Sequence, residues 1–277
     1  VEDWGIRLAQ LGGALSFDAD SVTGQGIAAT LDGHAVDMGV RIGGSVLNED
    51  NRLEATLRGK LPITSVFRGY PDLDSVLDRF DGQSDWFMNL ELSAEQAMAR
   101  LQMESDLVGT AGYLPEPMGK SIDQARQMRV EMTVPEDLAP IKLWYGDTLA
   151  ARFAMRDSGV HGQMTFGGDT GPLPTEPGIR IDGYVERLDW SDWVDDMAML
   201  MPRDARNHTA TALLGIDLRV GWLRTLGSQF TGITIDAQRD GPYFEVNLES
   251  DDVSGQIRML ASMQPLSTVV ADFDRVH

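Results

Sequence analysis

Apolar and polar side chains alternate along most of the chain. In residues 243–250 (YFEVNLES), Phe244, Val246 and Leu248 alternate with polar residues, and residues 215–222 (GIDLRVGW) repeat the pattern. Successive side chains of a strand point to opposite faces, so this alternation is typical of antiparallel strands with one polar face. Short turns that contain Gly, Asp or Asn separate many of these stretches. The pattern predicts roughly a dozen strands and an all-β protein.

Two stretches have helical rather than alternating spacing. They are residues 70–82 (YPDLDSVLDRFDG) and residues 190–202 (WSDWVDDMAMLMP). Pro71 suits the first turn of the first stretch, Ser191 is a candidate N-cap for the second, and Pro202 follows its end. We expect two short amphipathic helices that lay an apolar stripe on the sheet or along its open edge.

Composition and charge exclude several classes of function. The 277 residues are 42% hydrophobic and carry a formal net charge of −20, and none of them is cysteine. Such a charge repels nucleic-acid phosphates and anionic lipid headgroups, so we expect no nucleic-acid partner. The absence of cysteine excludes disulfides and thiolate chemistry. No uncharged run approaches the ~18 residues of a membrane span.

One short stretch resembles a nucleotide site without having its chemistry. Residues 112–121 (GYLPEPMGKS) end like a phosphate-binding loop, but six residues rather than four separate Gly112 from Gly119. Pro115 and Pro117 also lack the backbone N–H groups that would bind phosphate. We therefore expect a connector here, in which Lys120 has a structural role or lies at a rim.

The search for catalytic or metal-binding residues is negative. The four histidines lie far apart in the sequence, without a second ligand at metal spacing. Asp195 and Asp196 are adjacent on the second predicted helix and would point about 100° apart, which does not form a carboxylate dyad. No Gly-x-Ser-x-Gly nucleophile turn is present. We predict a protein that is not an enzyme and that uses no cofactor or metal.

Proline-rich connectors divide the strands into groups near residues 112–121 and 168–178. No change in composition requires a domain boundary, so we expect one continuous segment over residues 1–277. Periodicity alone favours an ordinary closed core, such as a sandwich or a barrel, over an open apolar face.

Three passages carry a family resemblance. Residues 101–132 contain Ser-Asp-Leu-x-Gly, then Leu-Pro-x-Pro and a basic residue: Ser105, Asp106, Leu107, Gly109, Leu114, Pro115, Pro117 and Lys120. Residues 162–200 contain a Pro-x-x-Pro-Gly connector and Leu-Asp-x-x-x-Trp at the start of a helix. Residues 230–259 contain Ser250, Asp252, Val253, Ser254 and Gly255 in a similar rhythm. Together they resemble the YhdP family, large AsmA-like proteins of the Gram-negative cell envelope.

The resemblance implies a fold and a location. Members of the YhdP family have a long, strongly curved antiparallel β-sheet with an apolar concave side, and they carry an amino-terminal inner-membrane helix. That helix is not in this sequence, so we interpret the chain as an internal fragment of a periplasmic protein that is anchored to the inner membrane.

The resemblance also implies a function, which is lipid binding and transfer between the inner and outer membranes with phospholipid as the ligand. Outer-membrane or other envelope proteins are possible partners. The alternative is a structural or assembly scaffold of the envelope that conducts no lipid. On the lipid reading the groove is lined by Val36, Met38, Val40, Leu53, Leu57, Trp86, Met88, Leu90, Leu101, Met103, Leu149, Phe153, Met155, Ile179, Ile181, Val185, Leu218, Val220, Ile233, Ile235, Phe244, Val246, Leu248 and Ile257.

Overall fold

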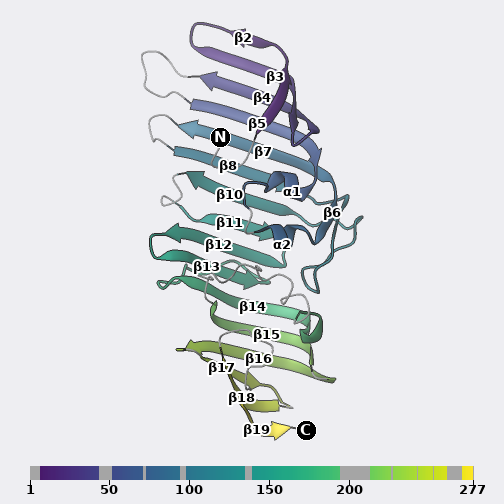
Figure 1. The fold of residues 1–277 in the computed structure, drawn as a ribbon, viewed down its shortest axis with the longest axis vertical. Coiled ribbons are helices and arrows are strands. Elements are labelled where there is room, and N and C mark those ends of the chain that lie inside the picture. The colour runs from purple at the N-terminus through teal and green to yellow at the C-terminus, as the bar shows by residue number, and fades with distance from the viewer. Residues whose placement is uncertain are drawn as a thin grey trace. The chain divides into compact units, whose positions relative to one another are not determined.

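The computed structural model describes residues 7–43, 52–70, 73–93, 98–134, 139–193, 213–225, 227–241, 243–251, 253–260 and 270–276. The chain divides into two compact units. Unit 1 comprises residues 1–114 and 119–146, and unit 2 comprises residues 115–118 and 147–277. Strands dominate both units (Figure 1), which confirms the predicted all-β class.

Unit 1 contains an antiparallel meander in which most strands pair with their neighbours in sequence. The order of paired strands is β2-β3-β4-β5-β7-β8-β10-β11, with β1 also paired to β3, and β6 and β9 form a separate small sheet. The elements are β1 (Leu8–Gly12), β2 (Leu15–Phe17), β3 (Ser21–Leu31), β4 (His34–Gly43), β5 (Arg52–Leu61), α1 (Ile63–Val66), α2 (Asp74–Leu77), β6 (Phe80–Gly82), β7 (Ser84–Ser93), β8 (Met98–Ser105), β9 (Thr110–Gly112), β10 (Met128–Val134) and β11 (Ile141–Tyr145).

Tight turns set the register of this meander. Asp32 and Gly33 join β3 to β4 with φ of 52° and 83°. Two positive φ values in a two-residue loop are typical of the type I′ turn, whose twist matches that of paired strands. Asp and Gly are the residue types that accept this backbone at low cost.

Unit 2 differs from the prediction at one strand. β14 is parallel to both of its neighbours, whereas the other pairings of unit 2 are antiparallel. The connections before and after β14 are much longer than a hairpin turn, so each can return the chain to the starting edge of the sheet. The elements are β12 (Leu149–Arg156), β13 (Gly159–Phe166), β14 (Gly178–Asp189), β15 (Leu213–Thr225), β16 (Ser228–Asp240), β17 (Tyr243–Glu249), β18 (Val253–Leu260) and β19 (Val270–Val276).

The first predicted helix ends earlier than expected. Among the described residues of 70–82, Asp74–Leu77 form the helix α2, and Phe80 belongs to β6, because pairing with β9 competes with helix continuation. Helix α1 follows Pro62 directly and was not predicted, since four residues are too few to show a helical period. Residues 190–193 are helical as expected, and the rest of the second predicted helix lies outside the described residues. Among the residues described, no helix is long and apolar enough to cross a bilayer.

Candidate functional site

Strand register places the predicted lining residues of unit 1 on one face. Residues directly opposite each other on paired strands share a face of the sheet. Met38 lies opposite Leu57, Leu57 opposite Met88, and Met88 opposite Met103, so that an apolar row crosses the strands. Parallel rows contain Val36, Gly59 and Trp86; Val40, Ala55, Leu90, Leu101 and Met132; and Ile42, Leu53, Leu92, Ala99 and Val134. We call this surface the apolar face of unit 1.

The opposite face of the same strands is charged. Arg41 lies opposite Glu54, Lys60 opposite Asp85, and Glu131 opposite Lys142. The guanidinium of Arg129 approaches the Glu104 carboxylate at 3.6 Å across β8 and β10. Because these oppositely charged side chains favour contact with solvent, unit 1 presents one charged, solvent-facing side and one apolar face.

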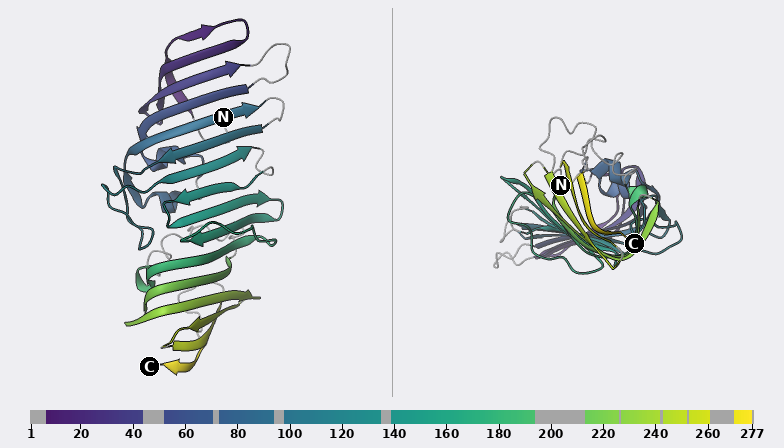
Figure 2. Two further views of the ribbon diagram at one scale, coloured as in Figure 1. Left: turned by 180° about the vertical axis from the view of Figure 1, so that it is seen from behind. Right: turned by 90° about the horizontal axis from the view of Figure 1, so that it is seen from below.

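One part of the apolar face is covered by the chain itself. The Phe67 ring, just after α1, meets the Trp86 indole edge to face with centroids 6.0 Å apart. The Tyr70 hydroxyl donates to the Met132 sulfur at 3.3 Å. Trp86 is 2% exposed and Met103 is 1% exposed. In Figure 1 α1 lies in front of the strands, and Figure 2 shows the strands from behind with α1 and α2 on their far side.

The other margin of the same face is open. Ile42 is 40% exposed, and Leu53, Leu90 and Leu92 are half-buried. Phe17 continues the row of Ile42 onto β2 through Val22 and is 72% exposed. A strip of apolar side chains thus crosses the strands of unit 1 without protein over it in the described residues. We call it the open margin.

Unit 2 has a corresponding apolar face. Val185, Val220 and Ile233 lie opposite one another on β14, β15 and β16. They belong to a buried cluster with Leu188, Leu218 and Leu223, against which Ile181, Ile235 and Leu248 pack. The register puts the other predicted residues on this face as well: Leu149, Phe153, Met155, Ile179, Phe244, Val246 and Ile257.

Exposure differs across the predicted set in unit 2. Leu149 is buried, Phe153, Ile179, Val246 and Ile257 are half-buried, and Met155 is exposed. For Phe244 only the position on β17 is described, and its side chain lies outside the described residues. Leu188 and Leu223 were not predicted, because Leu188 comes three residues after Val185 and therefore breaks strict alternation.

Trp193 connects the second predicted helix to this face. Its indole packs against the buried cluster of unit 2, and its N–H donates to the Glu116 carbonyl at 2.8 Å. Of the apolar stripe expected on this helix, Trp193 packs on the sheet, and the other residues of the stripe lie outside the described residues. Glu116 belongs to the Leu-Pro-x-Pro connector. This hydrogen bond therefore joins two of the passages that carry the family resemblance.

The Ser-Asp-Leu-x-Gly motif forms a tight turn at the end of β8. The Ser105 hydroxyl accepts the Leu107 N–H at 3.0 Å, and the Asp106 carboxylate accepts the Val108 N–H at 2.9 Å. Leu107 has a φ of 54° and is fully buried, and Gly109 has a φ of 95°. A Cβ at Gly109 would collide with the Gln83 carbonyl oxygen, so a larger residue cannot fit.

Lys120 closes this turn from the inside. Its ammonium donates to the backbone carbonyls of Leu107, Thr110 and Ser121, which uses all three of its N–H groups. Burial lowers the pKa of the Lys120 ammonium, and the positive charge of Arg126 lowers it further. The expected structural role of Lys120 is confirmed, and its amine is not presented to a ligand.

A buried polar cluster holds the crossover between β13 and β14. The His161 ring contacts the Ser158 hydroxyl at 2.9 Å and the Pro174 carbonyl at 3.0 Å. Gln163 and Thr165 on the same face both donate to the Asp182 carboxylate. Because both ring nitrogens of His161 have hydrogen-bond partners, we assign this side chain a structural role.

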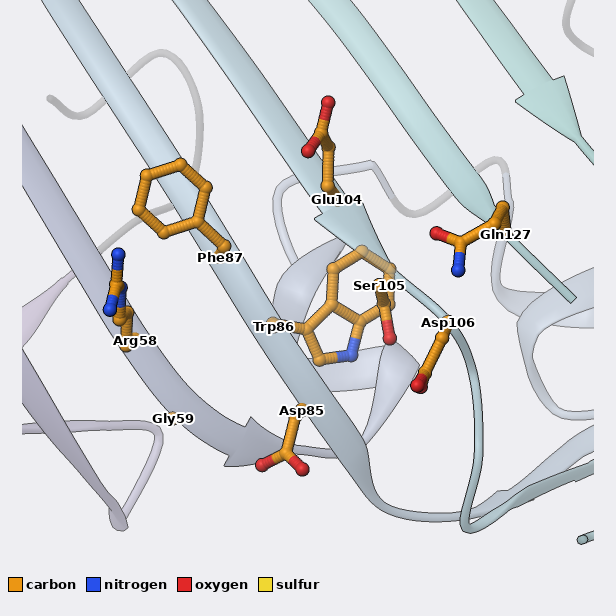
Figure 3. A pocket seen from close by; sticks show the side chains of 9 residues that line it. All are labelled: Arg58, Gly59, Asp85, Trp86, Phe87, Glu104, Ser105, Asp106 and Gln127. Atoms are coloured by element: carbon orange, nitrogen blue, oxygen red, sulfur yellow. The ribbon is translucent and has the colours of Figure 1, made fainter. Parts of the chain in front are cut away.

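Unit 1 has a hollow of about 410 Å³ that is lined by residues from both faces of the sheet, including Trp86 and Phe87 (Figure 3). Arg58, Asp85, Phe87, Glu104, Asp106 and Gln127 are among its lining residues, and the Arg58 guanidinium lies over the Phe87 ring at 5.0 Å. Ser105 also lines it, and the side chains of Ser105 and Asp106 accept the backbone N–H groups of Leu107 and Val108. In the described part of the chain, no three His, Cys, Asp or Glu side chains are grouped to hold a metal.

Comparison with known proteins gives one match. The family model described as YhdP protein matches residues 1–277, the whole chain. No curated protein and no solved structure shows significant similarity.

Proposed function

Because the chain belongs to the YhdP family, an AsmA-like family of the cell envelope, we propose that it is a lipid-binding and lipid-transfer module. Its apolar faces carry the acyl chains of phospholipids in the periplasm, between the inner and outer membranes. In the longer parent protein a helix in the inner membrane anchors it, and further envelope proteins are its partners.

The energetics of a phospholipid define what such a module must supply. The two acyl chains have ~30 methylenes, each worth ~0.8 kcal/mol on removal from water, so exposing both costs ~24 kcal/mol. An uninterrupted apolar surface offsets most of this cost without specific polar contacts. Methionine, of which the chain has 14, suits a surface that accepts chains of different length and unsaturation.

The open margin of unit 1 is the observation that carries the proposal. Its apolar side chains cross several strands in line, and the reverse side of those strands is charged. An ordinary core would be covered along its whole width, whereas the described residues cover one part of this face. Lys120 and His161, which could serve catalysis, have hydrogen-bond partners of their own: backbone carbonyls for Lys120, and the Ser158 hydroxyl and the Pro174 carbonyl for His161. These contacts support a role without covalent chemistry.

Native mass spectrometry of the purified chain, followed by lipid extraction, tests the proposal. We expect bound phospholipid, and we expect Leu53→Asp in the open margin to lose most of it. Arg52→Asp is the matched control, because it places a carboxylate one residue away on the charged face. Leu53 is preferable to Met103 or Val185, since a charge at either fully buried position would unfold the sheet.

The outcome separates the two functions. Equal lipid content in both variants, with both folded by circular dichroism, would contradict lipid binding on the open margin. A lipid-free mass and no uptake from mixed micelles by the unmodified chain would favour the scaffold function instead.

A further inference from the structure

The covered part of the apolar face of unit 1 raises a separate question. If lipid occupies the open margin, as proposed above, residues 62–70 occupy the neighbouring surface that acyl chains would otherwise reach. We call residues 62–70 the cover segment. Four of its residues, Ile63, Ser65, Val66 and Phe67, are buried against unit 1.

The cover segment has little intrinsic helical stability. Its helix α1 has four residues, its N-cap is Pro62 without a side-chain cap, and its first turn contains no acidic residue. Helices of this length do not persist without tertiary contacts. The position of the segment therefore depends on what it touches, which includes the apolar face, the Met132 sulfur and a polar contact point on another turn.

Asp32 is that polar contact point. Its carboxylate accepts the Ser65 hydroxyl at 2.9 Å and pairs with the Arg68 guanidinium. Asp32 belongs to the β3–β4 turn, which the register of two long strands holds in place. The Arg68 side chain is largely exposed, and exposed ion pairs are weak and sensitive to salt. We call these two contacts the Asp32 latch.

The surface beneath the cover segment is not fully satisfied by it. Trp86 meets Phe67 only through its ring, and the buried Trp86 Nε1 has no hydrogen-bond partner. The Ser84 hydroxyl, two residues before it on β7, is also buried without a partner. Such groups are rare in native interiors.

We propose that the cover segment is a lid on the apolar face, held shut by the Asp32 latch. When the latch opens, the segment leaves Trp86 and Met132, and acyl chains from the open margin take its place. The position of the lid thereby determines the width of the strip of the apolar face that lipid can occupy. This inference rests on the proposed lipid function and adds a control to it.

Because the chain has no cysteine, a pair introduced at the latch would be the only thiols in the chain. The double variant Asp32→Cys/Ser65→Cys closes it when oxidised and removes it when reduced. Phospholipid with brominated acyl chains reports contact by quenching tryptophan. Repeating the experiment with Trp86→Phe identifies the share due to Trp86. We expect Trp86 quenching in the reduced form and its loss in the oxidised form, while mass spectrometry finds lipid in both.

Asp32→Asn provides an independent variant that needs no oxidation. Asn tolerates the positive φ of this turn, so the hairpin remains while the charge is lost. We expect Trp86 quenching to rise about two- to fivefold over the unmodified chain. Ser65→Cys alone has no second thiol with which to form a disulfide, so its Trp86 quenching should not change when the oxidant is added.

The possible results separate the lid from the lipid function. Equal Trp86 quenching in oxidised and reduced forms, with lipid bound in both, would overturn the lid and leave the proposed function standing. Absence of lipid from every form, including the unmodified chain, would overturn the proposed function and the lid with it.

Discussion

Lys120 shows how one residue of a recurring motif acts through the backbone. Its ammonium binds three carbonyls of the turn that follows β8, and it is buried with them. The bonds compensate for removing a charge from water, and the lowered pKa shows that the compensation is incomplete. The lysine of the Gly-Lys-Ser stretch that resembles a nucleotide site therefore links backbone segments inside the protein.

We predict that Lys120→Met lowers the free energy of unfolding by about 2–4 kcal/mol at neutral pH, because three carbonyls lose their donor. The folded state binds the Lys120 proton less tightly than the unfolded chain does. The stability of the unmodified chain relative to Lys120→Met should therefore rise as pH increases toward the ordinary lysine pKa. Urea unfolding at neutral pH and at about pH 9–10 measures both effects.

Lys60→Met is the control for this prediction. Lys60 is exposed on the charged face opposite Asp85, so its replacement should cost less than about 0.5 kcal/mol. Equal losses in the two variants would show that the carbonyl contacts of Lys120 do not stabilise the turn.

The parallel strand β14 is the element that most changes the expected architecture. A parallel neighbour requires the chain to cross the sheet, and the connector before β14 does so beside the ring of His161. The proline-rich composition of this connector predicts a break between strand groups and does not reveal the direction of the next strand. The direction depends on where the connector docks, and His161 is one of its docking points.

We predict that His161→Ala destabilises the protein by about 2–4 kcal/mol, since it opens a cavity and leaves the Pro174 carbonyl unpaired. Hydrogen exchange should become faster in β13 and β14 and remain unchanged in β4 and β5 of unit 1. Ser158→Ala keeps the Pro174 contact and should cost about 1 kcal/mol. The docking role would be wrong if exchange in β13 and β14 were the same in His161→Ala as in the unmodified chain.

At the scale of the whole molecule, a strongly acidic exterior accompanies the apolar faces. The net charge of −20 includes the charged face of unit 1, which lies directly behind the residues proposed to hold lipid. The apolar faces can bind acyl chains through buried apolar area alone. The negative charge of the exterior weakens adsorption to anionic bilayers.

We predict that vesicles with anionic phospholipid bind the chain less than purely zwitterionic vesicles at low ionic strength. The difference should shrink in salt approaching ~1 M, where the screening length falls to ~3 Å. Vesicle flotation at two salt concentrations measures it. Stronger binding to anionic vesicles at low salt would contradict the prediction and would indicate a basic docking surface.

The amino-acid sequence by itself determined which side chains share a face. A strand has a side-chain period of two, so the positions of Met38, Leu57, Met88 and Met103 follow from alternation once the strands pair. Alternation did not find Leu188 and Leu223, because both depart from the period of two.

Only the tertiary structure decided what covers those faces. Helix α1 is too short to leave a periodic signal, and its burial depends on Trp86, about twenty residues later, and on Asp32, about thirty residues earlier. The parallel direction of β14 likewise depends on contacts made by its connector. Local side-chain geometry thus specifies the faces of a sheet, whereas long-range contacts specify which parts of them stay open.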